Sequence, residues 1–330
     1  MRNKQVLLAS RPKGQVQESD FRLVESETQA PREGQVLARV LYLSLDPYMR
    51  GRMDDARSYA QPQPVGEVMV GGTVAEVVES KDPGLRKGDL VTGMGGWQQF
   101  HVADAKALRK IDVSLAPPSA YLGVLGMPGV TAWYGLMQIG KPKAGETVVV
   151  SAAAGAVGSV VGQLAKIAGC RAVGVAGGPA KCEHVVRDLG FDACIDYKSP
   201  SFRDDFKKAT PDRIDVVFEN VGGEVFDSAL ARMNAFGRVA LCGLVAGYSG
   251  QDIALHNVRS LLVNRLLVQG FIVSEHLEIW PQAHRELAGH VAAKRIRYRE
   301  TVAEGLENAP RAFIGMLRGE NLGKQVVKVA

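Results

Sequence analysis

The chain has 330 residues, of which 46% are hydrophobic and 23% charged, and this balance is typical of a globular protein with room for two domains. It excludes a disordered or fibrous chain. The formal charge of +5 comes from a scattered excess of Lys and Arg. We therefore expect no nucleic-acid partner, because proteins that bind nucleic acids concentrate their positive charge.

Two further features of composition bear on location. The longest uncharged stretch, 148–165, is rich in Ala and Gly, so it is better explained by a strand, turn and helix than by a membrane span. The four cysteines form no C-x-x-C pair, and no signal peptide follows Met1. We expect reduced thiols, a cytoplasmic location and no membrane partner.

The first third of the chain is predicted to be rich in β-strands. Residues 36–43 are almost continuously apolar, and 67–70 and 73–78 are β-branched runs separated by two glycines. Glycines and prolines interrupt the region at short intervals. Short strands joined by such turns indicate a compact barrel or sandwich.

Beyond residue 126 strands and helices alternate. Strands are predicted over 148–150, 172–176, 214–218, 239–242 and 266–272, and helices over 157–168, 180–189 and 280–293. This alternation predicts βαβ units and a doubly wound parallel sheet covered on both faces. A helix over 309–317 and a strand over 325–329 end the chain.

A glycine turn links the 148–150 strand to the helix that follows it. The sequence from Ser151 to Gly158 matches a dinucleotide-binding fingerprint in which Ala153 replaces the first glycine. Gly155 would let the backbone approach a pyrophosphate, and Gly158 would let helix and strand pack closely. The alternative is a tight turn in an ordinary α/β domain.

The end of the next strand distinguishes NADP from NAD. An NAD site presents Asp or Glu there to bind the ribose hydroxyls, whereas this chain has Gly177-Gly178-Pro179 and then Lys181. A carboxylate would repel the 2′-phosphate of NADP, and a lysine can bind it. The sequence therefore favours NADP(H), the alternative being that Lys181 is an ordinary exposed cation.

The sequence lacks the residue patterns of two other kinds of dehydrogenase. No cysteine precedes residue 170, and Glu67 has no histidine partner, so the ligands of a zinc dehydrogenase are absent and we expect no metal. No Tyr has a Lys four residues later, the pair that short-chain reductases use. Hydride transfer would then need an activated acceptor, such as a C=C bond conjugated to a carbonyl.

Six segments, in order along the chain, carry a family resemblance. They are 43–50 (LSLDPYMR), 126–132 (GMPGVTA), 153–159 (AAGAVGS), 219–223 (ENVGG), 305–308 (GLEN) and 321–324 (NLGK). The chain resembles the zinc-independent medium-chain dehydrogenase/reductases. Within this family it is similar to the prostaglandin reductases, leukotriene hydroxydehydrogenases and plant double-bond reductases, and most of all to bacterial curcumin/dihydrocurcumin reductases.

The resemblance implies an architecture and a set of cofactor contacts. It implies a GroES-like catalytic domain over 1–125, completed by 300–330, and a Rossmann NADP-binding domain over 126–299. The turn from Gly155 through Ala156, Val157 and Gly158 to Ser159 would contact the pyrophosphate, and Lys181 and Tyr197 the 2′-phosphate. The further cofactor residues implied are Thr131, Asn220, Cys242, Gly243, Tyr248, Phe271, Ile272, Val273 and Asn321. Ala154 stands where the family often has Ser or Thr.

The expected activity is NADPH-dependent reduction of the C=C bond of α,β-unsaturated ketones or aldehydes. Tyr48, Tyr59 and Tyr248 are candidate donors to the enolate oxygen, because a phenol stays protonated at neutral pH; each could instead be a packed ring. Residues 266–273 could pair across a homodimer as an edge strand. A quinone reductase and a non-catalytic NADPH sensor remain alternatives.

Overall fold

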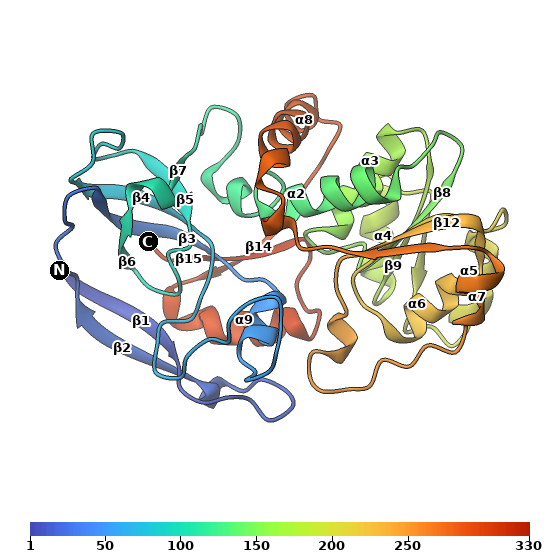
Figure 1. The fold of residues 1–330 in the computed structure, drawn as a ribbon, viewed down its shortest axis with the longest axis horizontal. Coiled ribbons are helices and arrows are strands. Elements are labelled where there is room, and N and C mark those ends of the chain that lie inside the picture. The colour runs from blue at the N-terminus through green and yellow to red at the C-terminus, as the bar shows by residue number, and fades with distance from the viewer. The chain divides into compact units, whose positions relative to one another are not determined.

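The computed structural model describes residues 1–330. The chain divides into two compact units, one formed by Met1–Gly123 with Glu300–Ala330 and the other by Val124–Arg299 (Figure 1). Each unit is described separately below. No helix in the structure is long and apolar enough to cross a membrane.

The first unit is built mainly from β-strands. A hairpin pairs β1 (Arg2–Leu8) with β2 (Phe21–Glu27). A seven-stranded sheet has the order β14 (Glu300–Glu304), β15 (Lys324–Lys328), β3 (Gln35–Ser44), β4 (Thr73–Ser80), β5 (Leu90–Gly93) and β7 (Arg109–Lys110), and β6 (Phe100–Asp104) also pairs with β3. Its helices are α1 (Tyr48–Arg52) and α9 (Ala309–Leu317).

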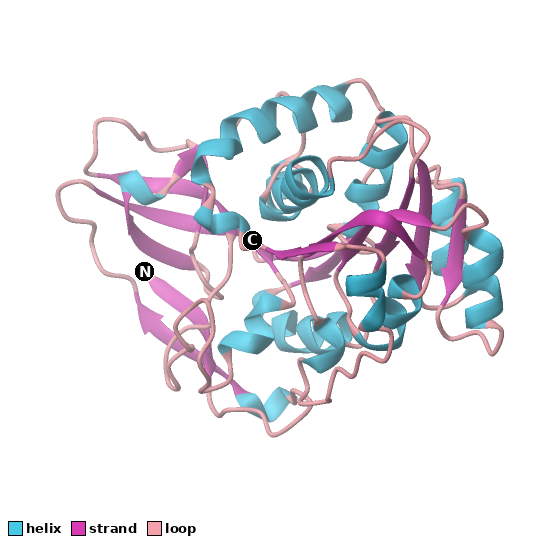
Figure 2. Ribbon diagram, turned by 45° about the vertical axis from the view of Figure 1, so that its right-hand side comes forward, coloured by secondary structure: helices cyan, strands magenta, loops and turns pink.

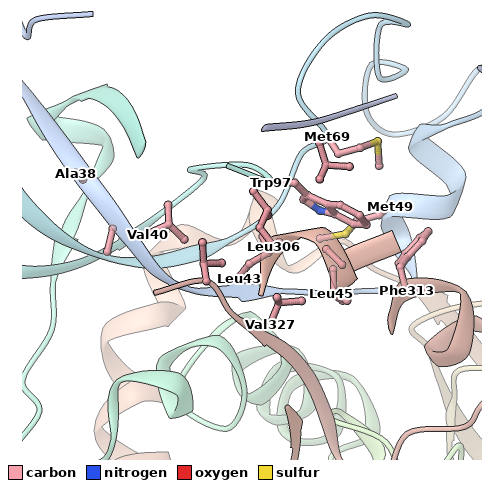
Figure 3. Close-up of a cluster of buried hydrophobic side chains, with 14 of the residues drawn as sticks. Ala38, Val40, Leu43, Leu45, Met49, Met69, Trp97, Leu306, Phe313 and Val327 are labelled. Atoms are coloured by element: carbon pink, nitrogen blue, oxygen red, sulfur yellow. The ribbon is translucent and has the colours of Figure 1, made fainter. Parts of the chain in front are cut away.

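One apolar core holds the two sequence segments of the first unit together. Trp97 is fully buried, stacks on Phe21 at 5.4 Å between ring centroids, and meets Phe313 edge-on at 5.6 Å. Figure 3 shows Leu306, Phe313 and Val327 from the C-terminal segment among side chains of the N-terminal segment. Burial of this apolar surface holds the C-terminal segment Glu300–Ala330 to the N-terminal segment.

A buried ion pair also joins β15 to the segment that follows β3. The Lys324 ammonium donates to the Asp46 carboxylate at 2.8 Å and to the Leu45 carbonyl at 2.6 Å. Both charged side chains are almost fully buried. The Ser44 hydroxyl also donates to Asp46, so the buried charges are paired and hydrogen-bonded, as burial requires.

The second unit contains a six-stranded parallel sheet. The order is β10 (Ala193–Asp196), β9 (Arg171–Ala176), β8 (Thr147–Ser151), β11 (Ile214–Glu219), β12 (Met233–Leu241) and β13 (Leu267–Gly270). Figure 2 shows helices on both sides of these strands. They are α2 (Met127–Trp133), a π-helix over Tyr134–Gly140, α3 (Gly158–Ile167), α4 (Pro179–Arg187), α5 (Phe202–Ala209), α6 (Gly223–Leu230), α7 (Arg259–Val263) and α8 (Trp280–Ala292).

This strand order confirms the predicted doubly wound fold. In chain order the strands run 3-2-1-4-5-6, the arrangement of dinucleotide-binding domains. The chain leaves β8 toward β9 on one side and later returns to β11 on the other. The carboxyl ends of β8 and β11 therefore mark the switch point where such sheets bind ligands.

Two predicted strands differ in the structure. Residues 67–70 form only an isolated bridge between Leu7 and Val68, because glycines on both sides of the segment allow it to bend between β1 and the loop at Trp97. The last strand of the parallel sheet ends at Gly270 rather than at residue 272. There Phe271 turns to pack against Tyr134 and Phe218.

Candidate active site

The glycine turn lies directly after β8, and its geometry requires glycine at one position. A Cβ atom at residue 158 would lie 2.4 Å from the Ala152 carbonyl oxygen, and one at residue 155 would lie 3.2 Å from the same oxygen. Helix α3 begins at Gly158 without a side-chain N-cap. The N–H of Ser159 donates to the Gly155 carbonyl and that of Val160 to the Val157 carbonyl, each at 3.0 Å. The start of a helix that follows a strand and a glycine turn is where dinucleotide-binding folds hold a pyrophosphate, so this end of α3 is the candidate anion site.

Ala152 adopts an unusual backbone conformation in this turn, with a φ of +50°. The left-handed region costs a residue with a Cβ about 1 kcal/mol or more. We expect Ala152→Gly to raise the free energy of unfolding by about 1 kcal/mol, measured by urea denaturation. Ala144→Gly, in an ordinary loop of the same unit, is the control. An equal or lower stability of the Ala152 variant would contradict the assignment of strain.

A buried network joins the ends of β8 and β11. The Ser151 hydroxyl donates to Glu219 Oε1 at 3.0 Å and accepts from the Asn220 backbone N–H at 2.7 Å, and the Asn220 side-chain amide donates to the Ser151 carbonyl at 2.8 Å. Glu219 Oε1 also accepts from the N–H groups of Val221 and Gly222. This network fixes Asn220 beside the glycine turn.

Glu219 carries an unusual charge state for a carboxyl group. Its side chain is fully buried, and Oε2 has no hydrogen-bond partner. Burial raises the pKa of Glu219 to about 7, although the hydrogen bonds to Oε1 oppose this shift. Near neutral pH a large fraction of this group is therefore protonated.

The loop after β12 attaches to the loop after β11. The backbone N–H groups of Cys242 and Gly243 donate to the Glu219 carbonyl at 2.8 and 3.1 Å. The Tyr248 hydroxyl lies near Gly243, 3.7 Å from where a Cβ would stand. Cys242, Gly243 and Tyr248 thus lie with Asn220 at the carboxyl edge of the sheet. All four residues are candidates for contact with the same bound cofactor.

The other predicted residues of this unit make contacts that constrain their roles. The Thr131 hydroxyl donates to the Met127 carbonyl at 2.8 Å within α2, so it remains available mainly as an acceptor. The Phe271 ring packs against Tyr134 and Phe218, so its side chain is engaged within this unit. Ile272 is half-buried and Val273 is buried.

The residues predicted to bind the 2′-phosphate come together after β9 and β10. A Cβ at Gly177 would lie 2.8 Å from the Tyr197 ring, so the absence of a side chain lets Tyr197 lie over the strand end. Burial and the nearby Lys198 charge lower the pKa of Lys181. Lys198 is thus close enough to Lys181 for its charge to act on it, and two neighbouring cations favour an anion beside them.

Lys198 was not among the residues singled out from the sequence. Its ammonium lies 5.9 Å from the centroid of the Tyr197 ring, and its backbone N–H donates to Asp196 at 2.9 Å. In the sequence, only its position directly after Tyr197 indicates that it could belong to the 2′-phosphate site. Its approach to Lys181 depends on β9 and β10 being neighbours, which the sequence does not show.

The first unit holds the remaining candidates. Tyr48 starts α1 and is half-buried, and burial together with the Asp46 charge raises the pKa of its phenol. Tyr59 acts on the same phenol electrostatically and is 55% exposed. The two tyrosines are therefore neighbours, and Tyr48 is a protonated hydrogen-bond donor at neutral pH. The Asn321 side-chain amide donates to the Gly323 carbonyl at 2.8 Å.

These residues fit the groups of a dinucleotide phosphate. The second unit has a helix start directly after the glycine turn, and Lys181 and Lys198 after the next two strands, as candidates for the pyrophosphate and for a further phosphate. The structure contains no group of three or more His, Cys, Asp or Glu side chains that could hold a metal ion. The fold and the site together define a dinucleotide-dependent oxidoreductase with a separate β-rich domain.

Comparison with known proteins gives the family. Residues 4–111 match the model for the N-terminal domain of oxidoreductases, and residues 156–289 match the model described as zinc-binding dehydrogenase. The NADPH-dependent curcumin reductase of Escherichia coli is 48% identical over 100% of this chain and 97% of its own length. The NADP⁺-dependent 2-alkenal reductase of Nicotiana tabacum is 41% identical over 99% and 98%.

A solved structure agrees with these relatives. The crystal structure of CurA from Vibrio vulnificus in complex with NADPH has 43% identity, covers 99% of each chain and superposes with a TM-score of 0.94. The chain belongs to the zinc-independent medium-chain dehydrogenase/reductase family, in the group that contains curcumin and prostaglandin reductases. This confirms the family and fold expected from the sequence motifs.

Proposed function

We propose that this protein is an NADPH-dependent reductase of the C=C bond of α,β-unsaturated ketones and aldehydes. Membership of the family supports an NADP-dependent oxidoreductase acting on C=C bonds. The observation that carries the choice of cofactor is that the charge of Lys198 acts on Lys181, which follows β9 in a segment with no carboxylate of its own. Family resemblance supports a cytoplasmic enzyme.

When bound, NADPH supplies the hydride that adds to the β-carbon of the enone. The chain itself would orient the cofactor through the α3 N-terminus at the pyrophosphate and through Lys181, Tyr197 and Lys198 at the 2′-phosphate. Asn220, Cys242, Gly243 and the backbone of 271–273 would line the remaining path. Thr131 and Asn321 complete the proposed set of contacts.

Tyrosine hydroxyls would stabilise the negative charge on the substrate oxygen. Tyr248 is the first candidate because it lies near Gly243 at the carboxyl edge of the sheet. Tyr48 and Tyr59 are the next candidates, because they are close enough to interact electrostatically and a phenol is protonated at neutral pH. A positioned donor of this kind contributes a few kcal/mol to the transition state.

The test follows the oxidation of NADPH and NADH spectrophotometrically with a panel of enones, enals and quinones. We expect enones and enals to be turned over with NADPH and at least about tenfold less efficiently with NADH. Faster turnover of quinones would identify a quinone reductase instead. Tight NADPH binding without turnover of any acceptor would identify a sensor.

We also propose that the protein forms a homodimer through β13. This strand is last in the sheet order and pairs only with β12, so one edge of its backbone is open. Leu267 is 53% exposed and Leu262 of the neighbouring α7 is 80% exposed. An open strand edge flanked by exposed apolar side chains favours pairing with a second copy.

Leu267→Asp should weaken this dimer. A buried carboxylate on each copy would be costly to desolvate, so we expect the dissociation constant to rise at least about tenfold, measured by analytical ultracentrifugation. Leu277→Asp is the control, since Leu277 is similarly exposed but lies outside β13 and α7. A wild-type protein that is monomeric at micromolar concentration would contradict the proposal.

A further inference from the structure

Two cysteines of the second unit form a close thiol pair. Cys182 lies on α4 and Cys194 on β10, and both are half-buried and free. The Cys194 thiol donates to the Cys182 sulfur, with 2.9 Å between the two Sγ atoms. A disulfide needs a separation of about 2.05 Å, so only a small movement separates this contact from a bond.

The contact makes the two thiols chemically unequal. Donation from Cys194 lowers the pKa of Cys182, and the same contact together with burial raises the pKa of Cys194. The thiolate is the reactive form of cysteine, so Cys182 is the attacking thiol and Cys194 the resolving one. By contrast, Cys170 is buried and its thiol contacts the Lys143 carbonyl.

The pair sits at the base of the proposed phosphate site. Cys182 directly follows Lys181, and Cys194 lies two residues before Asp196. The Asp196 carboxylate accepts the backbone N–H groups of Gly178 at 2.8 Å and Lys198 at 2.9 Å. Asp196 thus links the start of α4 to the segment after β10, and drawing the two sulfurs together would move Lys181 relative to Lys198.

We propose that Cys182 and Cys194 are a site of reversible oxidation by peroxides, and that the disulfide form binds NADPH more weakly. The first half stands on the thiol geometry alone; the second rests on the proposed function of Lys181 and Lys198. Displacing these charges weakens contacts that only the 2′-phosphate makes, so NADH should be affected less than NADPH.

The reaction balances with hydrogen peroxide as the two-electron oxidant. The Cys182 thiolate attacks one peroxide oxygen, the O–O bond breaks, and hydroxide leaves as water after taking up a proton. The Cys194 sulfur then attacks the Cys182 sulfenic acid, the S–S bond forms, the S–O bond breaks and a second water leaves. A thiol reductant restores both thiols.

The experiment treats the full-length protein with hydrogen peroxide and follows two properties. Mass spectrometry of peptides produced without reduction should show a peptide joining residues 182 and 194, with the loss of the mass of two hydrogen atoms. The KM for NADPH should rise about fivefold or more, the KM for NADH should change less, and dithiothreitol should reverse both changes. Cys182→Ser and Cys194→Ser should each abolish the cross-linked peptide, and Cys170→Ser should retain it.

The outcomes separate the two halves of the proposal. Absence of the 182–194 peptide in oxidised wild-type protein would overturn the modification site, whatever the activity. A complete disulfide with an unchanged KM for NADPH would overturn the effect on the cofactor. Failure of the reduced protein to use NADPH would instead count against the proposed function, and the peptide analysis would still decide the disulfide. Oxidised, reduced and re-reduced wild-type protein can be compared directly, so the test still works if a cysteine variant fails to fold.

Discussion

Replacing both lysines of the phosphate site, in Lys181→Ala/Lys198→Ala, should lower kcat/KM for NADPH at least about a hundredfold. A hydrogen bond to a charged group contributes about 1.5–3 kcal/mol, and each cation would lose such a contact with the 2′-phosphate. NADH lacks this phosphate, so kcat/KM for NADH should change by less than about threefold. The measurement is the ratio of the two efficiencies with one enone as acceptor.

The single variants and a control make this result specific. Each single variant should show an intermediate loss with NADPH, because either lysine alone retains part of the attraction. Lys208→Ala removes an exposed lysine from α5 of the same unit and should leave the ratio unchanged. If NADH and NADPH efficiencies fell together in the double variant, the lysines would support the fold rather than choose the cofactor.

Replacing Glu219 with Gln should change how stability depends on pH. Burial raises the pKa of Glu219 to about 7 in the folded protein, whereas an unfolded chain gives a glutamate its ordinary value of about 4.3. The folded state therefore holds a proton that the unfolded state releases between these values. This contribution to stability is complete below the lower pKa and is lost as the pH rises toward the higher one.

The expected size of the effect follows from the shift. A glutamine side chain at this position cannot ionise. The free energy of unfolding of Glu219→Gln minus that of wild type should therefore rise by about 3 kcal/mol from pH 4 to pH 8. Urea denaturation of both proteins across this range measures the difference. Glu33→Gln, at an exposed position of the other unit, is the control. A difference between Glu219→Gln and wild type that did not vary with pH would show that burial does not hold the proton.

The apolar patterns and the glycines were enough to predict much of the fold. The strand over 148–150, the glycine turn and the helix after it appear in the structure as β8 and α3. The C-terminal helix over 309–317 coincides with α9. These elements follow from local sequence, because side-chain periodicity and turn residues act over a few positions. The hairpin of β1 and β2 was not predicted.

Local sequence predicted the alternating strands and helices, the glycine turn and the lack of a carboxylate directly after β9, since each depends on residues close together in the chain. Only the tertiary structure brought Lys198 to Lys181, Cys194 to Cys182 and Glu219 to Ser151. Each of these pairs joins residues that lie on, or directly after, different strands or helices. Their contact depends on the order of strands in the sheet, which is set by long-range packing and burial rather than by local pattern.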